Sequence, residues 1–215
     1  MNRRLATKRI SRKLLIACEG RRTERDYFSG YGSIRRIPHV SIEFLRHEHT
    51  DPLGIVTSLL ESWSEKLREG TFSPQMGDQP WAVFDVDEHR NHRPEDFKKA
   101  IQLAASNSIY LALSNPSFEL WLLKHFKYVS ANLDRFKANS DLKKEIADYD
   151  KVLTDSQKTL LYSKMSTAVA NSQQLETRNQ QPEYATDPFY NPSTGVHRLT
   201  LLIKEIGDRI QNRNP

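Results

Sequence analysis

The stretch Trp81-Ala82-Val83-Phe84-Asp85-Val86-Asp87 joins a short apolar run to two acidic residues. An apolar run of this length, bounded by polar residues, predicts a strand buried on both faces of a sheet. A similar arrangement occurs earlier, where Leu14-Leu15-Ile16-Ala17-Cys18 stops at Glu19-Gly20. The two runs therefore predict two core strands, each followed directly by acidic residues.

Outward from these strands, the first half of the chain alternates strand and helix signals. Four strands are predicted, at residues 14–18, 40–46, 81–84 and 109–113. Helices are predicted to open at Thr23, Asp51-Pro52, Pro94 and Asn115-Pro116. This alternation predicts an α/β fold with a four-stranded, mostly parallel sheet and flanking helices. Right-handed crossovers and a switch point between the first and third strands predict the strand order 2-1-3-4.

The second half of the chain has a different character. Residues 131–180 predict polar helical segments, residues 180–193 predict a loop with three prolines, and residues 196–206 predict a final amphipathic helix. We expect three parts: a basic arm over residues 1–13, an α/β domain over residues 14–127, and a helical C-terminal region over residues 128–215 packed on that domain.

Composition limits the classes of protein to which the chain can belong. The net charge of +5 and an opening arm with six basic and no acidic residues favour an anionic partner, although a solvated tail is the alternative. The single cysteine, Cys18, excludes an internal disulfide and paired-cysteine zinc sites, and it fits a reducing cytoplasm. No apolar run approaches the roughly 20 residues of a membrane span, and the arm lacks an apolar signal core, so we expect a cytoplasmic protein.

The acidic residues after the two core strands predict a metal site. If the two strands are neighbours, Glu19, Asp85 and Asp87 converge at the carboxyl edge of the sheet. Converging carboxylates repel one another unless a cation lies among them, and hard oxygen ligands suit Mg²⁺ or Mn²⁺. In an extended strand end Asp85 and Asp87 point to the same side. Solvated loop acids are the alternative for Glu19 and Asp87.

Four motifs resemble the RloB-like protein family. These are Cys18-Glu19-Gly20 with Thr23-Glu24 and Tyr27-Phe28, then Phe84 to His89, then Ser114-Asn115-Pro116-Ser117-Phe118-Glu119-Leu120-Trp121, and finally Asn191 to Thr194. The family is similar to Toprim-fold nucleases of phage defence, including the abortive-infection component AbiLii. The resemblance implies a Toprim-like α/β domain that holds Mg²⁺ or Mn²⁺ and cleaves DNA or RNA, with an ABC-type ATPase encoded nearby as partner. The alternative is a catalytically degraded, Toprim-like interaction or nucleic-acid-binding subunit.

The resemblance also implies roles for individual residues. Glu19, Asp85 and Asp87 would hold the metal, and Glu24 and Glu119 would support a second ion. Glu24 and Glu119 could instead be first-turn acids stabilised by the helix dipole.

Three basic residues are candidates for nucleic-acid contact. Arg21 and Arg22 could clamp a phosphate or only balance nearby acids, and Lys164 could neutralise a phosphate or be a solvated helix lysine. Because no extended basic track is visible, we expect the isolated chain to be weakly active or silent and to require the ABC-type ATPase.

Overall fold

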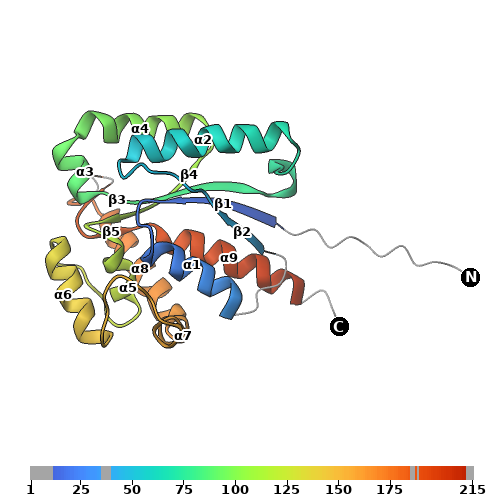
Figure 1. Cartoon of the computed structure of the whole chain (residues 1–215). Helices are drawn as coiled ribbons and strands as arrows, with labels where there is room; N and C mark the ends of the chain where they lie inside the picture. The colour runs from blue at the N-terminus through green and yellow to red at the C-terminus, as the bar shows by residue number, and fades with distance from the viewer. Residues whose placement is uncertain (1–11, 35–39, 185–186, 188, 212–215) are drawn as a thin grey trace, which may run out of the picture.

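One mixed sheet runs through the centre of the molecule (Figure 1). The computed structural model describes residues 12–34, 40–184, 187 and 189–211. Within that part of the chain the strands are β1 (Arg12–Cys18), β2 (Val40–Phe44), β3 (Gln79–Asp85), β4 (Tyr110–Asn115) and β5 (Ser193–Thr194). Residues 1–11 of the predicted basic arm lie outside the described residues.

The strand order is β2-β1-β3-β4-β5, and the first four strands are parallel. The predicted α/β class and the order 2-1-3-4 are therefore confirmed. The sequence did not predict β5, which pairs antiparallel with the end of β4 through Ser114 with Thr194 and Asn115 with Ser193. A two-residue strand that contains no apolar run carries no periodicity by which to recognise it.

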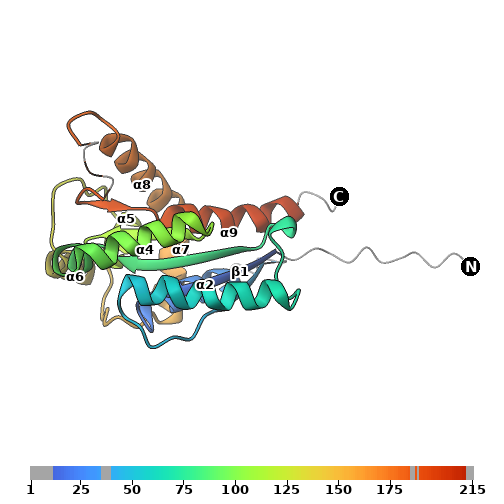
Figure 2. The ribbon, with the colours of Figure 1, turned by 90° about the horizontal axis from the view of Figure 1, so that it is seen from above.

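Helices cover both faces of the sheet (Figures 1 and 2). Their bounds are α1 (Thr23–Ile34), α2 (Pro52–Arg68), α3 (Asp87–His92), α4 (Pro94–Ser106), α5 (Phe118–Lys124), α6 (Arg135–Glu145), α7 (Asp155–Ser163), α8 (Met165–Asn179) and α9 (Val196–Gln211). A short 3₁₀ turn, η1 (Pro74–Met76), precedes β3. None of the helices in the described part of the chain is both long and apolar enough to cross a bilayer.

Successive side chains of β1 point to opposite faces of the sheet and so contribute to two layers of the core. Leu15 and Ala17 face α2 and α4, where they join a cluster with Ile55, Leu59 and Phe97. In this layer α2 begins as predicted, because the Asp51 carboxylate accepts a hydrogen bond of 2.8 Å from the Gly54 N–H.

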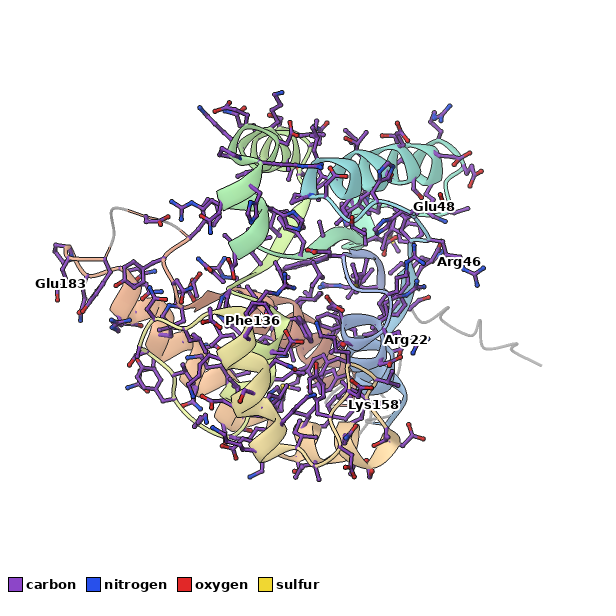
Figure 3. The ribbon with its side chains drawn as sticks, turned by 60° about the vertical axis from the view of Figure 1, so that its left-hand side comes forward. Arg22, Arg46, Glu48, Phe136, Lys158 and Glu183 are labelled. Atoms are coloured by element: carbon purple, nitrogen blue, oxygen red, sulfur yellow. The ribbon has the colours of Figure 1, made fainter. Side chains whose placement is uncertain are left out.

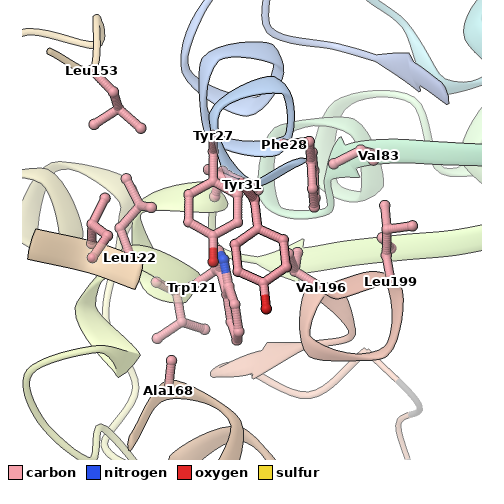
Figure 4. Close-up of a cluster of buried hydrophobic side chains, with 14 of the residues drawn as sticks. Tyr27, Phe28, Tyr31, Val83, Trp121, Leu122, Leu153, Ala168, Val196 and Leu199 are labelled. Carbon is pink, nitrogen blue, oxygen red and sulfur yellow. The ribbon is translucent and has the colours of Figure 1, made fainter. Parts of the chain in front are cut away.

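The opposite face of the sheet builds the larger cluster. Leu14 and Ile16 of β1 pack there with residues of α1, α5, α7, α8 and α9. At its centre Tyr27 is fully buried and makes edge-on contacts with Phe28 and Trp121 (Figure 4). Both halves of the chain therefore contribute side chains to one core.

Two connections near the carboxyl edge of the sheet differ from the sequence prediction. The chain turns helical at Val86 (φ −96°, ψ −44°), so Asp87 is the first residue of α3 and not an extension of β3. Asn115 stays in β4 because it pairs with β5, and its side-chain amide donates to the Phe189 carbonyl at 2.6 Å. The next helix consequently begins at Phe118 with Ser117 as its N-cap, and Asn115 does not cap it.

Candidate functional site

A cavity of about 360 Å³ opens at the carboxyl ends of the parallel strands. It lies where β1 leads into α1, where β3 ends, and where β4 leads into α5, with α6 and the segment before α7 on its other side. The residues that line it are Glu19, Gly20, Arg21, Arg22, Thr23, Glu24, Thr50, Asp85, Phe118, Glu119, Arg135 and Lys151. Four of these are carboxylic acids and four are permanently or normally cationic, so the cavity combines both signs of charge.

Glu19 and Asp85 meet across the β1–β3 pair. One carboxylate oxygen of Glu19, Oε2, accepts a hydrogen bond of 3.0 Å from the Asp85 backbone N–H. The other, Oε1, lies 3.0 Å from Nε2 of His89 in α3. The Asp85 carboxylate accepts a hydrogen bond of 2.9 Å from the Phe118 N–H. These contacts fix both carboxylates, and each oxygen retains lone pairs for a further partner.

Glu24 and Glu119 form the buried floor of the cavity, each with 6% of its surface exposed. Glu24 Oε1 accepts a hydrogen bond of 3.2 Å from the Gly20 N–H. An added Cβ at Gly20 would lie 1.9 Å from Glu24 Oε2, so a side chain at this position would displace the Glu24 carboxylate. Glu119 accepts hydrogen bonds from the hydroxyls of Ser117 at 2.7 Å and Tyr149 at 3.2 Å.

Two of the four carboxylic acids, Glu24 and Asp85, hold their protons more tightly than usual. Burial raises the pKa of Glu24 to about 7, and the charges of Glu19 and Glu119 add to the effect. Burial likewise raises the pKa of Asp85 well above its ordinary value, followed in size by repulsion from Glu19, Glu24 and Glu119, while Arg135 opposes the shift. Protonation of these buried carboxylates, or binding of a cation among them, would therefore stabilise the floor of the cavity.

Cationic side chains surround this acidic floor. Arg21 and Arg22 are exposed in the turn that leads into α1. Arg135, at the start of α6, places Nη2 3.8 Å from Asp85 Oδ2. Lys151 places Nζ 3.7 Å from Glu119 Oε1, with 60% of its side chain exposed. The rim can therefore contact a polyanion that enters the cavity.

Two predicted site residues lie elsewhere. Asp87 begins α3 and is not among the residues that line the cavity, because the turn at Val86 removes it from the extended end of β3. Lys164 lies between α7 and α8, where its Nζ sits 5.4 Å from the ring centre of Phe126. It also does not line the cavity, so this position gives no support to phosphate contact by Lys164.

Arg135 and Lys151 were not predicted to lie at the site, and His89 was noted only as part of a family motif. Asp134 carries the one local signal near Arg135, since its carboxylate caps α6 by accepting from the Lys137 N–H at 2.7 Å. That signal marks where a helix starts but not what the helix faces. Lys151 is held at the cavity by a hydrogen bond between segments far apart in the sequence, in which the Thr23 hydroxyl donates to the Lys151 carbonyl at 2.6 Å.

The residues present fit a divalent cation by their chemistry. Among the described residues, no three His, Cys, Asp or Glu side chains stand in a ready-made metal-binding arrangement. The mutual repulsion around Asp85 and Glu24 is nevertheless the condition that an added cation relieves, and carboxylate oxygens are the ligands of Mg²⁺ and Mn²⁺. Glu19, Asp85, Glu24 and Glu119 are the donors available at this cavity.

Comparison with known proteins identifies one family. A family model described as RloB-like protein matches residues 14–205, which spans most of the chain and every cavity residue. No curated protein matches the chain.

Proposed function

The chain belongs to the family of RloB-like proteins, and on that premise we propose that it is a metal-dependent nuclease that hydrolyses phosphodiester bonds of nucleic acid. The observation that carries the proposal is the gathering of four carboxylates, Glu19, Glu24, Asp85 and Glu119, in one cavity at the carboxyl edge of a parallel sheet. Such an edge is where α/β proteins bind their ligands.

The acidic and the basic residues of the cavity would have different roles. Glu19 and Asp85 would hold Mg²⁺ or Mn²⁺, with Glu24 and Glu119 available to a second ion; Asp87 is part of the predicted metal set but lies outside the cavity. When bound, such an ion supplies a more acidic water and stabilises charge on the leaving oxygen. Glu24, whose pKa is about 7, can exchange a proton near neutral pH.

The cationic rim would hold the phosphodiester over the floor. Arg21 and Arg22 are exposed and offer the planar donors that suit phosphate oxygens. Arg135 Nη2 lies 3.8 Å from Asp85 Oδ2, and Lys151 Nζ lies 3.7 Å from Glu119 Oε1. A metal ion bound by these two carboxylates would replace the Arg135 and Lys151 contacts, and both basic side chains could then contact a substrate phosphate.

We further propose that the nuclease is the effector of a two-component phage-defence system with an ABC-type ATPase. Resemblance to the family supports this partner. The cavity adds a physical reason, because the four rim cations can neutralise only a few phosphates, and affinity for a long nucleic acid grows with each phosphate neutralised. A partner that extended the contact would position the strand more firmly.

The decisive experiment compares cleavage by the wild type and by Asp85→Asn, each with Mn²⁺ and the partner ATPase, on plasmid, single-stranded DNA and RNA. The asparagine oxygen can still accept the Phe118 N–H, so the fold should be retained while the charge is lost. Glu61→Gln, at an exposed position of α2, is the matched control. Cleavage should disappear in Asp85→Asn alone. Equal cleavage by all three proteins would overturn the proposal.

A second candidate function is binding without cleavage, as in a degraded Toprim-like subunit. The contacts of Arg135 with Asp85 and of Lys151 with Glu119 favour it, because these cations already balance part of the acidic charge. Titration with Mn²⁺ separates the two. A nuclease should bind Mn²⁺ and gain thermal stability in the wild type but not in Asp85→Asn, whereas a degraded site should show neither effect.

A further inference from the structure

Phe136 is the most exposed of the large hydrophobic side chains in the described part of the chain. Its exposed fraction is 79%, whereas the next, Tyr110, has 45%. A phenyl ring left this far in water contributes little to the core, since the free energy of burial scales with the area removed from solvent. The ring is therefore available for contact with another molecule.

The position of Phe136 links it to the acidic cavity. It directly follows Arg135, which lines the cavity, in the first turn of α6. Figure 3 looks toward the carboxyl ends of the strands, and Phe136 and Arg22 both lie on that face. Arg46, which is also exposed, lies on the same side as Arg22 in this view. An exposed aromatic ring and exposed guanidinium groups thus share the face on which the cavity opens.

This combination matches the way proteins hold single-stranded nucleic acid. A charged groove follows the backbone, and aromatic rings stack on unpaired bases. A base inside a duplex is already stacked on both faces and cannot offer one to a protein ring. The carboxylates of Glu24 and Glu119 lie on a buried floor, so a phosphodiester must also enter a cavity of about 360 Å³ to reach them. An unpaired strand can bend into such a space more readily than a duplex.

We propose that Phe136 is a base-stacking platform and that the substrate is a single-stranded polynucleotide, or an unpaired loop of a folded one. The proposal rests on the proposed nuclease function and adds the substrate class to it. Phe136 holds a base beside the cavity, and Arg21, Arg22, Arg135 and Lys151 hold the adjoining phosphates. Phe136 takes no part in the chemistry, so it is a positioning residue.

The test measures binding separately from cleavage. Fluorescein-labelled oligo(dT), oligo(U) of equal length and a fully paired duplex are titrated in EDTA with the wild type, Phe136→Ala, Phe136→Leu and Phe136→Tyr. Met76→Ala is the control, an exposed apolar residue in η1, which precedes the amino end of β3. Because Phe136 is exposed, its replacement should leave the fold intact, which circular dichroism can verify.

The expected result follows from the energetics of base stacking. Phe136→Ala and Phe136→Leu should weaken single-strand binding by about 5-fold to 100-fold, while Phe136→Tyr and Met76→Ala bind like the wild type. Duplex binding should be weaker than single-strand binding and unaffected by any variant. The ratio of oligo(dT) to oligo(U) affinity then separates DNA from RNA.

Other results would overturn the inference in recognisable ways. Single-strand binding by Phe136→Ala equal to the wild type, or a wild-type preference for duplex, would refute the stacking role even if Mn²⁺-dependent cleavage were intact. Loss of self-association in Phe136→Ala, seen by analytical ultracentrifugation with unchanged nucleic-acid affinity, would assign the ring to a protein contact instead. If the wild type neither bound nor cleaved any nucleic acid even with the ATPase present, the proposed nuclease function would fail as well.

Discussion

Replacing Glu24 with glutamine should stabilise the metal-free protein at alkaline pH and change it little at acid pH. Glu24 is 6% exposed, and its carboxylate is surrounded by those of Glu19, Asp85 and Glu119. Glutamine has nearly the same shape, and its oxygen can still accept the Gly20 N–H. The substitution therefore removes the charge while keeping the contact.

The size of the effect follows from the pKa of Glu24, which burial raises from 4.5 to about 7. The folded state binds the proton more tightly than the unfolded state, so stability is lost as pH rises through this window. At pH 8 the ionised group costs about 3 kcal/mol of folding free energy, since each pKa unit is worth about 1.4 kcal/mol. At pH 4.5 the cost falls to about 0.4 kcal/mol, because the folded carboxyl is protonated and the unfolded one half protonated.

Urea unfolding in EDTA at pH 8 and pH 4.5 measures this difference directly. The free energy of unfolding of Glu24→Gln should exceed that of the wild type by up to about 3 kcal/mol at pH 8 and by well under 1 kcal/mol at pH 4.5. Glu61→Gln, at an exposed helix position, should match the wild type at both values. A Glu24→Gln variant that is no more stable than wild type at pH 8 would show that burial and the neighbouring carboxylates do not destabilise the ionised Glu24 as argued.

Three further predictions concern the same fold and cavity. Mn²⁺ binding, measured by calorimetry, should weaken as pH falls from about 8 to 6, because the cation must displace the proton that Glu24 holds below pH 7; affinity independent of pH would contradict this. The wild type should gain stability as pH rises from about 7 to 9, because burial lowers the pKa of Lys124 to about 7 and the unfolded chain keeps the proton, and Lys124→Met should abolish that gain. Trp121→Ala should destabilise the protein by about 3–5 kcal/mol in urea unfolding, since Trp121 is fully buried among Tyr27 and its neighbours; a loss below about 1 kcal/mol would mean that the core closes over the space.

The sequence predicted the parts of the site that local patterns encode. The apolar runs before Glu19 and Asp85 marked two strands, and the alternation of strands and helices made them neighbours, so their meeting followed from topology. Asp87 was misplaced because an extended strand was assumed where the backbone turns helical at Val86. Asn115 was misassigned because Asn-Pro is a common start of a helix, whereas here a distant strand holds Asn115 extended.

The cationic side of the cavity could not be predicted in the same way. Arg135 and Lys151 come from segments far along the chain from Glu19, and they reach the cavity through contacts such as that of the Thr23 hydroxyl with the Lys151 carbonyl. Nothing in the spacing of residues around them distinguishes these cations from solvated ones. The exposure of Phe136 on the same face as the cavity likewise depends on where α6 lies in the fold, which the sequence around Phe136 does not indicate.

The core shared by both halves of the chain has a consequence for how the protein is made. Val196 and Leu199 of α9 belong to the same buried cluster as Leu14, Ile16 and Val83, so the cover on this face of the sheet stays incomplete until α9 has been synthesised. Glu119, the last of the four acids, precedes Arg135, Lys151 and α9 along the chain, so the acids are synthesised before the cations and the final helix. Chains that stop before α9 should therefore expose part of this core and aggregate, because the helix that completes the cluster is missing.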